Sequence, residues 1–219
     1  MRSIGVVTGS RAEARCLSGL AGRIVCSGAD AGRARRESER LAGEVEGLVS
    51  FGLAGALAPD LREGELLLPG EVIVPDGRRI ATDAAWRAHL TTLADARSGP
   101  LLGSDQLIES VTAKTALHRA SGAVALDMES HLVALAASAT GLPFVVIRAV
   151  TDPADQALPA VARVALDAEG RVRMLAVAAA LLRRPGDLPT LLRLARQSGA
   201  GLRTLRGVAA RAGPALGLR

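Results

Sequence analysis

Short apolar runs rich in β-branched residues alternate along the chain with stretches in which apolar residues recur every three or four positions. The apolar runs predict strands over residues 4–8, 23–27 and 47–51, and the periodic stretches predict helices from about residue 11 and over 32–42. Strands that alternate with helices are typical of a largely parallel sheet. The first part of the chain therefore predicts an α/β fold.

The middle of the chain continues the same alternation. The segment ELLLPGEVIVP at 65–75 predicts two strand pieces around a Pro-Gly turn, and helices are expected over 83–94, 111–120 and 128–140. The run PFVVIRAV at 143–150 is the clearest strand, because a continuous apolar run fits a parallel strand covered on both faces. We therefore expect a single α/β domain with a mixed, mostly parallel central sheet flanked by helices.

The last part of the chain has a different pattern. A hairpin is expected around residues 168–170, and a very apolar helix over 173–182. From Pro185 onward, leucines at helical spacing alternate with arginines, which predicts a basic amphipathic helical C-terminal tail. These patterns divide the chain into a main domain and the tail, over residues 1–182 and 183–219.

The net charge of +5 is unevenly distributed between these two parts. From Arg183 onward eight arginines stand against one acid, Asp187, so the tail carries +7 and the first 182 residues carry −2. A basic helix with a leucine face can lie on an anionic lipid surface, or it can pack that face on the protein or on a second subunit. The sequence leaves both alternatives open.

Composition excludes several classes of function. Only 1% of the residues are aromatic, which disfavours a nucleic-acid surface that stacks bases. Cys16 and Cys26 are expected to be reduced thiols of the core. The histidines lack ligand spacing, so no metal site is expected and no cofactor is implied; they are His89, His118 and His131.

The start of the chain predicts a short strand where a signal peptide would carry a longer apolar region. No run reaches the roughly 18 apolar residues of a membrane span. We therefore expect a cytoplasmic protein, peripheral at the inner membrane surface if the tail binds lipid.

Three segments place carboxylates at the ends of predicted strands, where open α/β sheets bind ligands. In the first, VVTGSRAE, Glu13 falls in the first turn of a helix. An acid at this position complements the helix dipole, and this segment alone requires no further role. The pattern of a phosphate-binding P-loop is absent.

The second segment is ALDMESH, in which Asp127 and Glu129 bracket Met128 where an apolar stretch gives way to a helix. Burying an ionised carboxylate without a partner is costly, so a polar group should meet at least one of the two. Helix capping is sufficient to explain Asp127. Glu129 is then the acid without a structural explanation.

The third segment is FVVIRAVTDPAD, in which a buried strand carries Arg148 and ends in Thr151 and Asp152. Asp before Pro commonly starts a turn, which is the alternative to a functional role. A buried Arg148 needs an anionic partner, however, and a carboxylate of a site is a natural one.

Taken together, these segments resemble the superfamily of methylthioadenosine/S-adenosylhomocysteine nucleosidases and purine nucleoside phosphorylases. The resemblance spans residues 1 to about 156. It is carried by SGADAG at 27–32, GLAGALAP at 52–59, LDME at 126–129 and VIRAVTD at 146–152. It implies an enzyme that cleaves the N-glycosidic bond of a purine nucleoside.

The resemblance also implies roles for individual residues. Asp152 would protonate the purine at N7, and Glu129 would accept hydrogen bonds from the ribose hydroxyls. Glu13 would activate the attacking water or contact the ribose. Carboxylates would stabilise the positive charge that develops on the sugar. Further candidate substrate contacts are Met128, Arg148, Gly55, Ala54, Leu107 and Ile108.

Two departures from the family pattern affect the expected site. Where the family has an aromatic residue that stacks on the base, this chain has SDQLI with Leu107 and Ile108, so stacking would be weaker. A phosphate site is not assigned, because arginines as common as Arg33, Arg35 and Arg36 usually lie on the surface. Phosphate therefore stays an alternative to water as the nucleophile.

The segments DPADQALP at 152–159 and LLRRPGDLPTLLRLA at 181–195 resemble the hopanoid-associated phosphorylase branch. This resemblance implies release of adenine from adenosylhopane in hopanoid biosynthesis, and a homodimer is expected. One alternative is an ordinary methylthioadenosine/S-adenosylhomocysteine nucleosidase. Another is a non-catalytic protein that binds nucleosides or associates with membranes.

Overall fold

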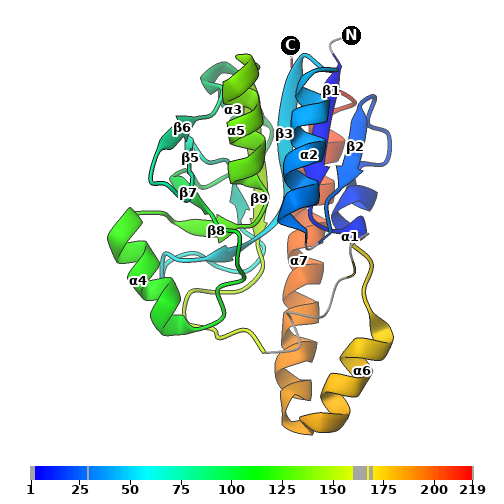
Figure 1. Cartoon of the computed structure of the whole chain (residues 1–219), viewed down its shortest axis with the longest axis vertical. Helices are drawn as coiled ribbons and strands as arrows, with labels where there is room; N and C mark the ends of the chain where they lie inside the picture. The colour runs from blue at the N-terminus through cyan, green and yellow to red at the C-terminus, as the bar shows by residue number, and fades with distance from the viewer. Residues whose placement is uncertain (1–2, 29, 160–166, 168–169, 219) are drawn as a thin grey trace.

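The fold is that of a computed structural model, which describes residues 3–28, 30–159, 167 and 170–218. Within these residues nine strands form one mixed sheet in the order β2-β1-β3-β8-β7-β5-β6, and β9 pairs with β3 and β4 (Figure 1). Five pairings are parallel, and the antiparallel ones are β3–β8, β4–β9 and β5–β6. The expected mixed, mostly parallel sheet is confirmed. The strands are β1 (Ile4–Thr8), β2 (Arg23–Cys26), β3 (Gly47–Ala56), β4 (Leu66–Leu67), β5 (Glu71–Ile73), β6 (Arg79–Ala81), β7 (Pro100–Gly103), β8 (Ala125–Asp127) and β9 (Phe144–Val150).

Helices cover both faces of this sheet. α2 and α5 pack side by side on one face, whereas α3, α7 and the 3₁₀ turn η1 cover the other (Figure 1). The helical elements are α1 (Arg11–Ala14), η1 (Arg15–Leu17), α2 (Ala31–Ala42), α3 (Ala84–Leu93), α4 (Val111–Ser121), α5 (Ser130–Thr140), α6 (Met174–Arg183), η3 (Pro185–Asp187) and α7 (Leu188–Ala212).

Strand β9 shows why the continuous apolar run was informative. Val146 and Val150 pack in the core beneath α2 and α5, while Val145 and Ile147 pack in the core beneath α3 and α7. Successive side chains of a strand point to opposite faces. Because helices cover both faces, all seven residues of β9 are buried.

The structure differs from the sequence-based elements in three ways. β6 and β7 were not predicted, and β8 was expected only as an apolar stretch without bounds before the 128–140 helix, because strands of three or four residues are too short to show alternation. β3 continues through Gly52 and Gly55 to Ala56, whereas the pattern predicted a strand over 47–51. α5 begins at Ser130, two residues later than predicted, because Asp127 still belongs to β8. The hairpin expected around residues 168–170 falls largely outside the described residues.

Helix α7 has two unlike halves. Leu205 and Val208 are fully buried in the same core cluster as residues of β1, β3 and β9, whereas Leu188 and Leu192 are 45% and 62% exposed. The first half of α7 projects below the body beside α6 (Figure 1). The division at residues 182/183 stays a prediction; the second half of α7 shares the core of the main domain. None of the described helices is long and apolar enough to cross a membrane.

Candidate active site

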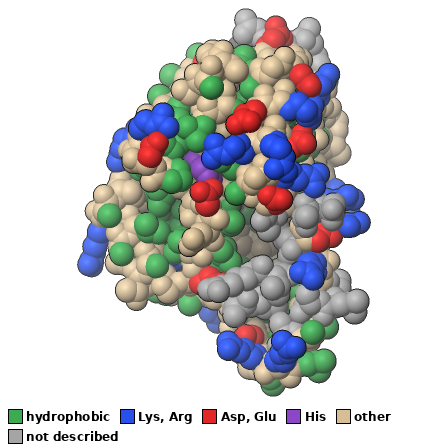
Figure 2. Space-filling model, in the orientation of Figure 1, with side chains coloured by type: hydrophobic (Ala, Val, Ile, Leu, Met, Phe, Trp, Pro, Cys, Tyr) green, Lys and Arg blue, Asp and Glu red, His purple; other side chains and the backbone are tan. Residues whose placement is uncertain are grey.

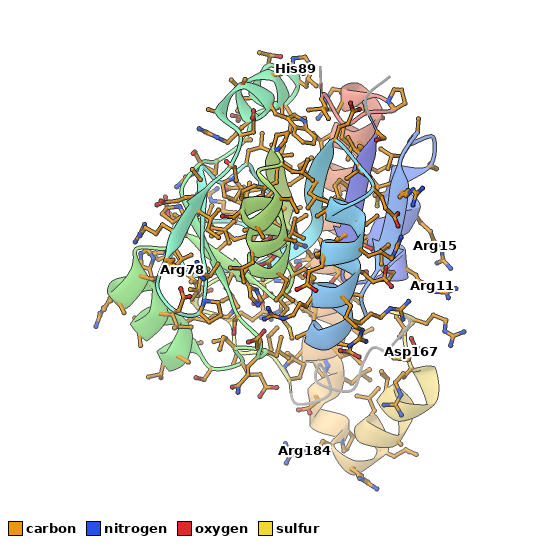
Figure 3. All side chains as sticks on the ribbon, turned by 45° about the horizontal axis from the view of Figure 1, so that its top comes forward. Arg11, Arg15, Arg78, His89, Asp167 and Arg184 are labelled. Carbon is orange, nitrogen blue, oxygen red and sulfur yellow. The ribbon has the colours of Figure 1, made fainter. Side chains whose placement is uncertain are left out.

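Glu13 lies in α1, directly after β1, and is buried although its neighbours Arg11 and Arg15 are exposed. Figure 3 shows both arginines at the outer edge of the molecule. Ser10 caps α1 by accepting a hydrogen bond from the Glu13 N–H, and Glu13 Oε2 accepts from the Ser10 N–H at 2.7 Å. Oε1 accepts from the N–H of Leu53 in β3 at 2.8 Å. The acid therefore serves the helix and also reaches across to β3.

Arg148, in the middle of β9, lies at the centre of a second group of side chains. It is fully buried, pairs with Gly52 across the sheet, and forms ion pairs with Asp127 and with Glu129, the latter at 3.3 Å. Its Nη2 also donates to Ser50 Oγ at 2.6 Å. A buried Arg148 thus has the anionic partners that the sequence required.

Asp127 contacts the start of α5, as the sequence suggested, but it also pairs with Arg148, as Glu129 does. Both oxygens of Asp127 accept from the N–H of Ser130 at 3.2 Å, which satisfies the start of α5. Glu129 occupies the N-cap position but makes no side-chain capping bond. Its carboxylate is therefore available for a ligand as well as for Arg148.

The environment of Glu129 opposes a negative charge. Burial raises the pKa of Glu129 to about 8, helped by the nearby Asp127 and Glu13 carboxylates and opposed by Arg148. For Arg148, burial acts to lower the pKa, but the surrounding carboxylates outweigh it and the pKa is raised. One cation thus faces more carboxylates than it can neutralise.

Glycines allow these side chains to lie directly against the backbone. A Cβ at Gly52 would overlap Arg148 and would lie 2.6 Å from Glu13 Oε1, and one at Gly9 would lie 2.7 Å from Glu129 Oε1. A Cβ at Gly55 would lie 3.1 Å from Asp152 Oδ2. Gly52 and Gly55 are three residues apart, which is roughly 10 Å along a strand. Side chains three residues apart on a strand point to opposite faces, so Glu13 and Arg148 approach β3 at Gly52 and Asp152 approaches it at Gly55 from the other side.

Asp152 follows β9 and is paired with Lys114 of α4, a residue to which the sequence analysis gave no role. Lys114 is 1% exposed, and its Nζ donates to Asp152 Oδ2 and to the carbonyls of Pro153 and Gln156 at 3.0 and 2.9 Å. Burial raises the pKa of Asp152, and Lys114 partly offsets this. The signal that could have revealed Lys114 is that it is the single lysine among 27 basic residues.

The other residues predicted to contact the substrate differ in how deeply they are buried. Met128 is half-buried between Asp127 and Glu129. Ala54 places its methyl group in the core, and its carbonyl accepts from the Thr151 N–H at 2.9 Å. Leu107 and Ile108 are half-buried, and Ile108 packs on a small cluster with Leu57 and Leu126. Their loop begins beside the site, because the Ser104 N–H donates to the carbonyl of Asp127.

Two buried polar atoms, one on β9 and one just after it, have no hydrogen-bond partner of their own among the described residues. Arg148 Nε and Thr151 Oγ1 are two of the buried side-chain atoms without a hydrogen-bond partner in the described part of the chain. Buried polar atoms are usually satisfied, so such atoms favour a site that a polar ligand or water completes.

Other features do not form a competing centre. Arg35 and Arg36 lie exposed on α2. No group of three His, Cys, Asp or Glu among the described residues could hold a metal ion. A cavity of about 510 Å³ lies at the opposite end of β9, lined in part by Asp83, Gly141 and Phe144. It contains none of the carboxylates described above, so the chemistry of the side chains locates the site better than cavity size does.

Comparison with known protein families matches residues 19–184 to the Phosphorylase superfamily. This chain belongs to that superfamily. It is thus homologous to nucleosidases and phosphorylases, enzymes that cleave N-glycosidic bonds.

Solved structures share the fold at low sequence identity. The Helicobacter pylori 5′-methylthioadenosine/S-adenosylhomocysteine nucleosidase, solved in complex with a substituted pyrrolidin-3-ol, is 17% identical with a TM-score of 0.68, covering 95% of this chain and 98% of its own. Futalosine hydrolase of the same organism is 18% identical with a TM-score of 0.68, covering 95% and 97%. The S. pneumoniae nucleosidase with a transition-state inhibitor is 16% identical with a TM-score of 0.70, covering 95% and 99%. Such coverage is too large to leave out α7, so the shared fold includes that helix.

Proposed function

We propose that this protein hydrolyses the N-glycosidic bond of a 5′-substituted adenosine and releases adenine. The observation that carries the proposal is the placement of two unlike charged clusters along one stretch of β3. Asp152 with Lys114 lies at Gly55, and Glu13, Glu129 and Arg148 lie around Gly52. The two clusters suit the two ends of a nucleoside, the base and the sugar.

At the base end, Asp152 acts as the general acid. Burial raises the pKa of Asp152, partly offset by Lys114, and in its protonated form Asp152 can donate to N7 of the purine as the bond to C1′ breaks. Protonation prevents negative charge from building up on the leaving base. A residue in this role typically contributes about 10²–10⁴-fold to the rate.

At the sugar end, the excess of carboxylates stabilises the positive charge that develops on the ribose. Glu129 accepts hydrogen bonds from the ribose hydroxyls, and Met128 packs on the sugar. Glu13 receives a proton from the attacking water. Its contact with the Leu53 N–H fixes the carboxylate at the strand on which the sugar would lie.

Water is favoured over phosphate as the nucleophile. Arg148 is the buried arginine of the site, and it is already engaged by Asp127, Glu129 and Ser50. Arg35 and Arg36 are exposed, so they line no enclosed anion pocket. A phosphate ion near the ribose would also face the carboxylate excess.

For the 5′ substituent we propose the hopanoid of adenosylhopane. The feature that supports a large lipid substituent is the projecting hairpin of α6 and α7. Leu182, Leu188 and Leu192 are exposed on this hairpin by 86%, 45% and 62%.

Arginines lie between those leucines, so leucine and arginine side chains meet at the projecting end in Figure 2. Figure 3 places Arg184 at this end. Exposed leucines beside arginines suit an anionic lipid surface. The hairpin would then bring the active site to the membrane that holds the substrate.

The decisive experiment measures free adenine from adenosylhopane and from methylthioadenosine, each with and without phosphate. Adenine release without phosphate is expected, with a preference for adenosylhopane. Release only with phosphate would overturn hydrolysis. A preference for methylthioadenosine would support the second candidate, an ordinary nucleosidase, which the shared fold favours. Binding without release would support a non-catalytic nucleoside-binding protein.

Lipid binding is tested with vesicles that contain phosphatidylglycerol. The variant with Leu182, Leu188 and Leu192 changed to glutamine should lose sedimentation with vesicles, while the exposed but remote Ile24→Gln serves as control. Deletion of residues 183–219 is unsuitable, because it removes buried Leu205 and Val208. Unchanged sedimentation would overturn the membrane proposal. Light scattering tests the expected homodimer, and a dimer lost in the triple variant would assign the leucines to a second copy.

A further inference from the structure

Lys114 is an unusual residue for its helix. It is the single fully buried residue of α4, whose other ten residues are half-buried or exposed. Lysine is almost never fully buried unless it is paired. A helix that buries its one lysine rather than an apolar residue does not gain hydrophobic stabilisation from that position. The burial therefore needs an explanation in the contacts of the ammonium group.

Those contacts saturate the ammonium group. Its three N–H donors meet three acceptors, which are Asp152 Oδ2 and the carbonyls of Pro153 and Gln156. The same short segment is attached elsewhere, by the Leu158 N–H to the carbonyl of Glu109 and by Gln197 of α7 to the side chain of Gln156. The backbone after β9 is thus held by other contacts as well. The pairing with Asp152 is the contact that only a cation can supply.

The choice of lysine fits this geometry. Every other basic residue of the chain is arginine, histidines apart. Lysine is a compact point charge whose three donors converge on one nitrogen, whereas the planar guanidinium of arginine spreads five donors in a fork. Three acceptors around one buried point match an ammonium group.

We infer that Lys114 is a positioning residue that holds Asp152 and balances the charge which Asp152 acquires on giving up its proton. The inference rests on the proposed N-glycosidic cleavage. As the bond between C1′ and the purine breaks, both electrons go to the purine, and the Asp152 proton forms the new N–H bond. The carboxylate left behind faces the Lys114 ammonium, which keeps all three of its protons. Solvent returns a proton to Asp152 after the purine departs.

The test compares two leaving groups on the same 5′-substituted riboside, adenine and 4-nitrophenolate. Adenine needs a proton to leave, whereas 4-nitrophenolate leaves without one. Lys114→Met should lower kcat about tenfold or more for adenine, as part of the contribution of a general acid, and leave kcat for 4-nitrophenolate near that of the unmodified protein. The high-pH limb of kcat/KM for adenine should move to higher pH, because Asp152 loses the cation that favours its ionised form.

Further variants separate this role from a structural one. Lys114→Arg keeps the charge, so the pH limb should stay in place while adenine release falls less than in Lys114→Met; it also serves if the methionine variant does not fold. Adding Lys114→Met to Asp152→Asn should cause no further loss of adenine release, because Lys114 acts through Asp152.

An equal loss of kcat for both leaving groups in a folded variant would overturn the inference. Lys114 would then have only a structural role. An unmoved pH limb in Lys114→Met would overturn it as well. Both results leave the proposed function intact, since the unmodified protein still releases adenine. An unmodified protein that cleaves neither riboside would overturn the proposed function, and this inference with it.

Discussion

The two charged clusters along β3 use similar side chains in different charge balances. Near Gly55, one lysine faces one carboxylate, Asp152. Near Gly52, Arg148 faces Asp127 and Glu129, with Glu13 beside them. In the balanced pair, the carboxylate that remains after a proton transfer is neutralised by the lysine beside it. An excess of carboxylates instead disfavours further negative charge and favours a positive one, as on a ribose that is losing its base.

The largest effect is expected from a substitution in the balanced cluster of Lys114 and Asp152. Asp152→Asn should lower kcat for adenine release by about 10²–10⁴-fold, because the amide cannot donate the proton that the leaving purine needs. Steady-state assays with methylthioadenosine or adenosylhopane measure it. Asp155→Asn, at an exposed site three residues on, is the matched control and should retain activity. Equal activity in both variants would remove Asp152 from the acid role.

The next largest effect is expected from a substitution in the cluster around Arg148. Arg148→Met should lower the free energy of unfolding by about 3–5 kcal/mol, because it leaves buried carboxylates without their cation. Urea denaturation measures the loss. Arg78→Met, which breaks the exposed pair with Asp76, should cost at most about 1 kcal/mol. A small loss at Arg148 would mean that the carboxylates are not held by charge pairing.

A smaller effect tests the close approach of backbone and side chains. Gly52→Ala should cost about 1–3 kcal/mol of stability, because its Cβ would overlap Arg148 and crowd Glu13. In Gly207→Ala, the Cβ would lie 3.5 Å from the end of the flexible Arg211 side chain within α7. That control should be neutral or slightly stabilising. Thermal unfolding of both variants measures the contrast, and equal stability would deny that Gly52 is sterically required.

The last effect concerns pH. The raised pKa of Glu129, about 8, means that the folded state holds a proton which the unfolded state releases above about pH 4.5. Stability from this group should therefore fall as pH rises from about 4.5 to about 8. Glu129→Gln should lessen this slope, measured by urea denaturation at several pH values. The same slope in both proteins would contradict the carboxylate excess.

Much of the fold was predictable because it depends on local periodicity. The apolar run at 143–150 could be predicted as a strand buried on both faces, because its own side chains are apolar throughout. Strand β9 is such a strand. The second half of β3 was missed, because Gly52 and Gly55 weaken any strand pattern. The glycines are instead explained by the side chains that lie against them.

The candidate site was predictable in part for a similar reason. Glu129 could be separated from Asp127 because capping is a local rule, and Arg148 could be expected to meet a carboxylate because a buried arginine needs an anion. Lys114 could not be placed, because its partner is 38 residues away and no periodicity links them. The tail shows the same limit: both halves of α7 have leucines at helical spacing, yet only Leu205 and Val208 reach the core.

By itself, then, the sequence determined the longer apolar runs that form strands, the helices around them and the segments in which the acids lie. These features depend on hydrophobic periodicity and on the cost of burying charge, which act within a few residues or on a single side chain. Only the tertiary structure decided which cation meets which carboxylate, and hence that one cluster is balanced and the other is not. Charge balance depends on distances across the sheet, and those distances exist only once the strands are paired.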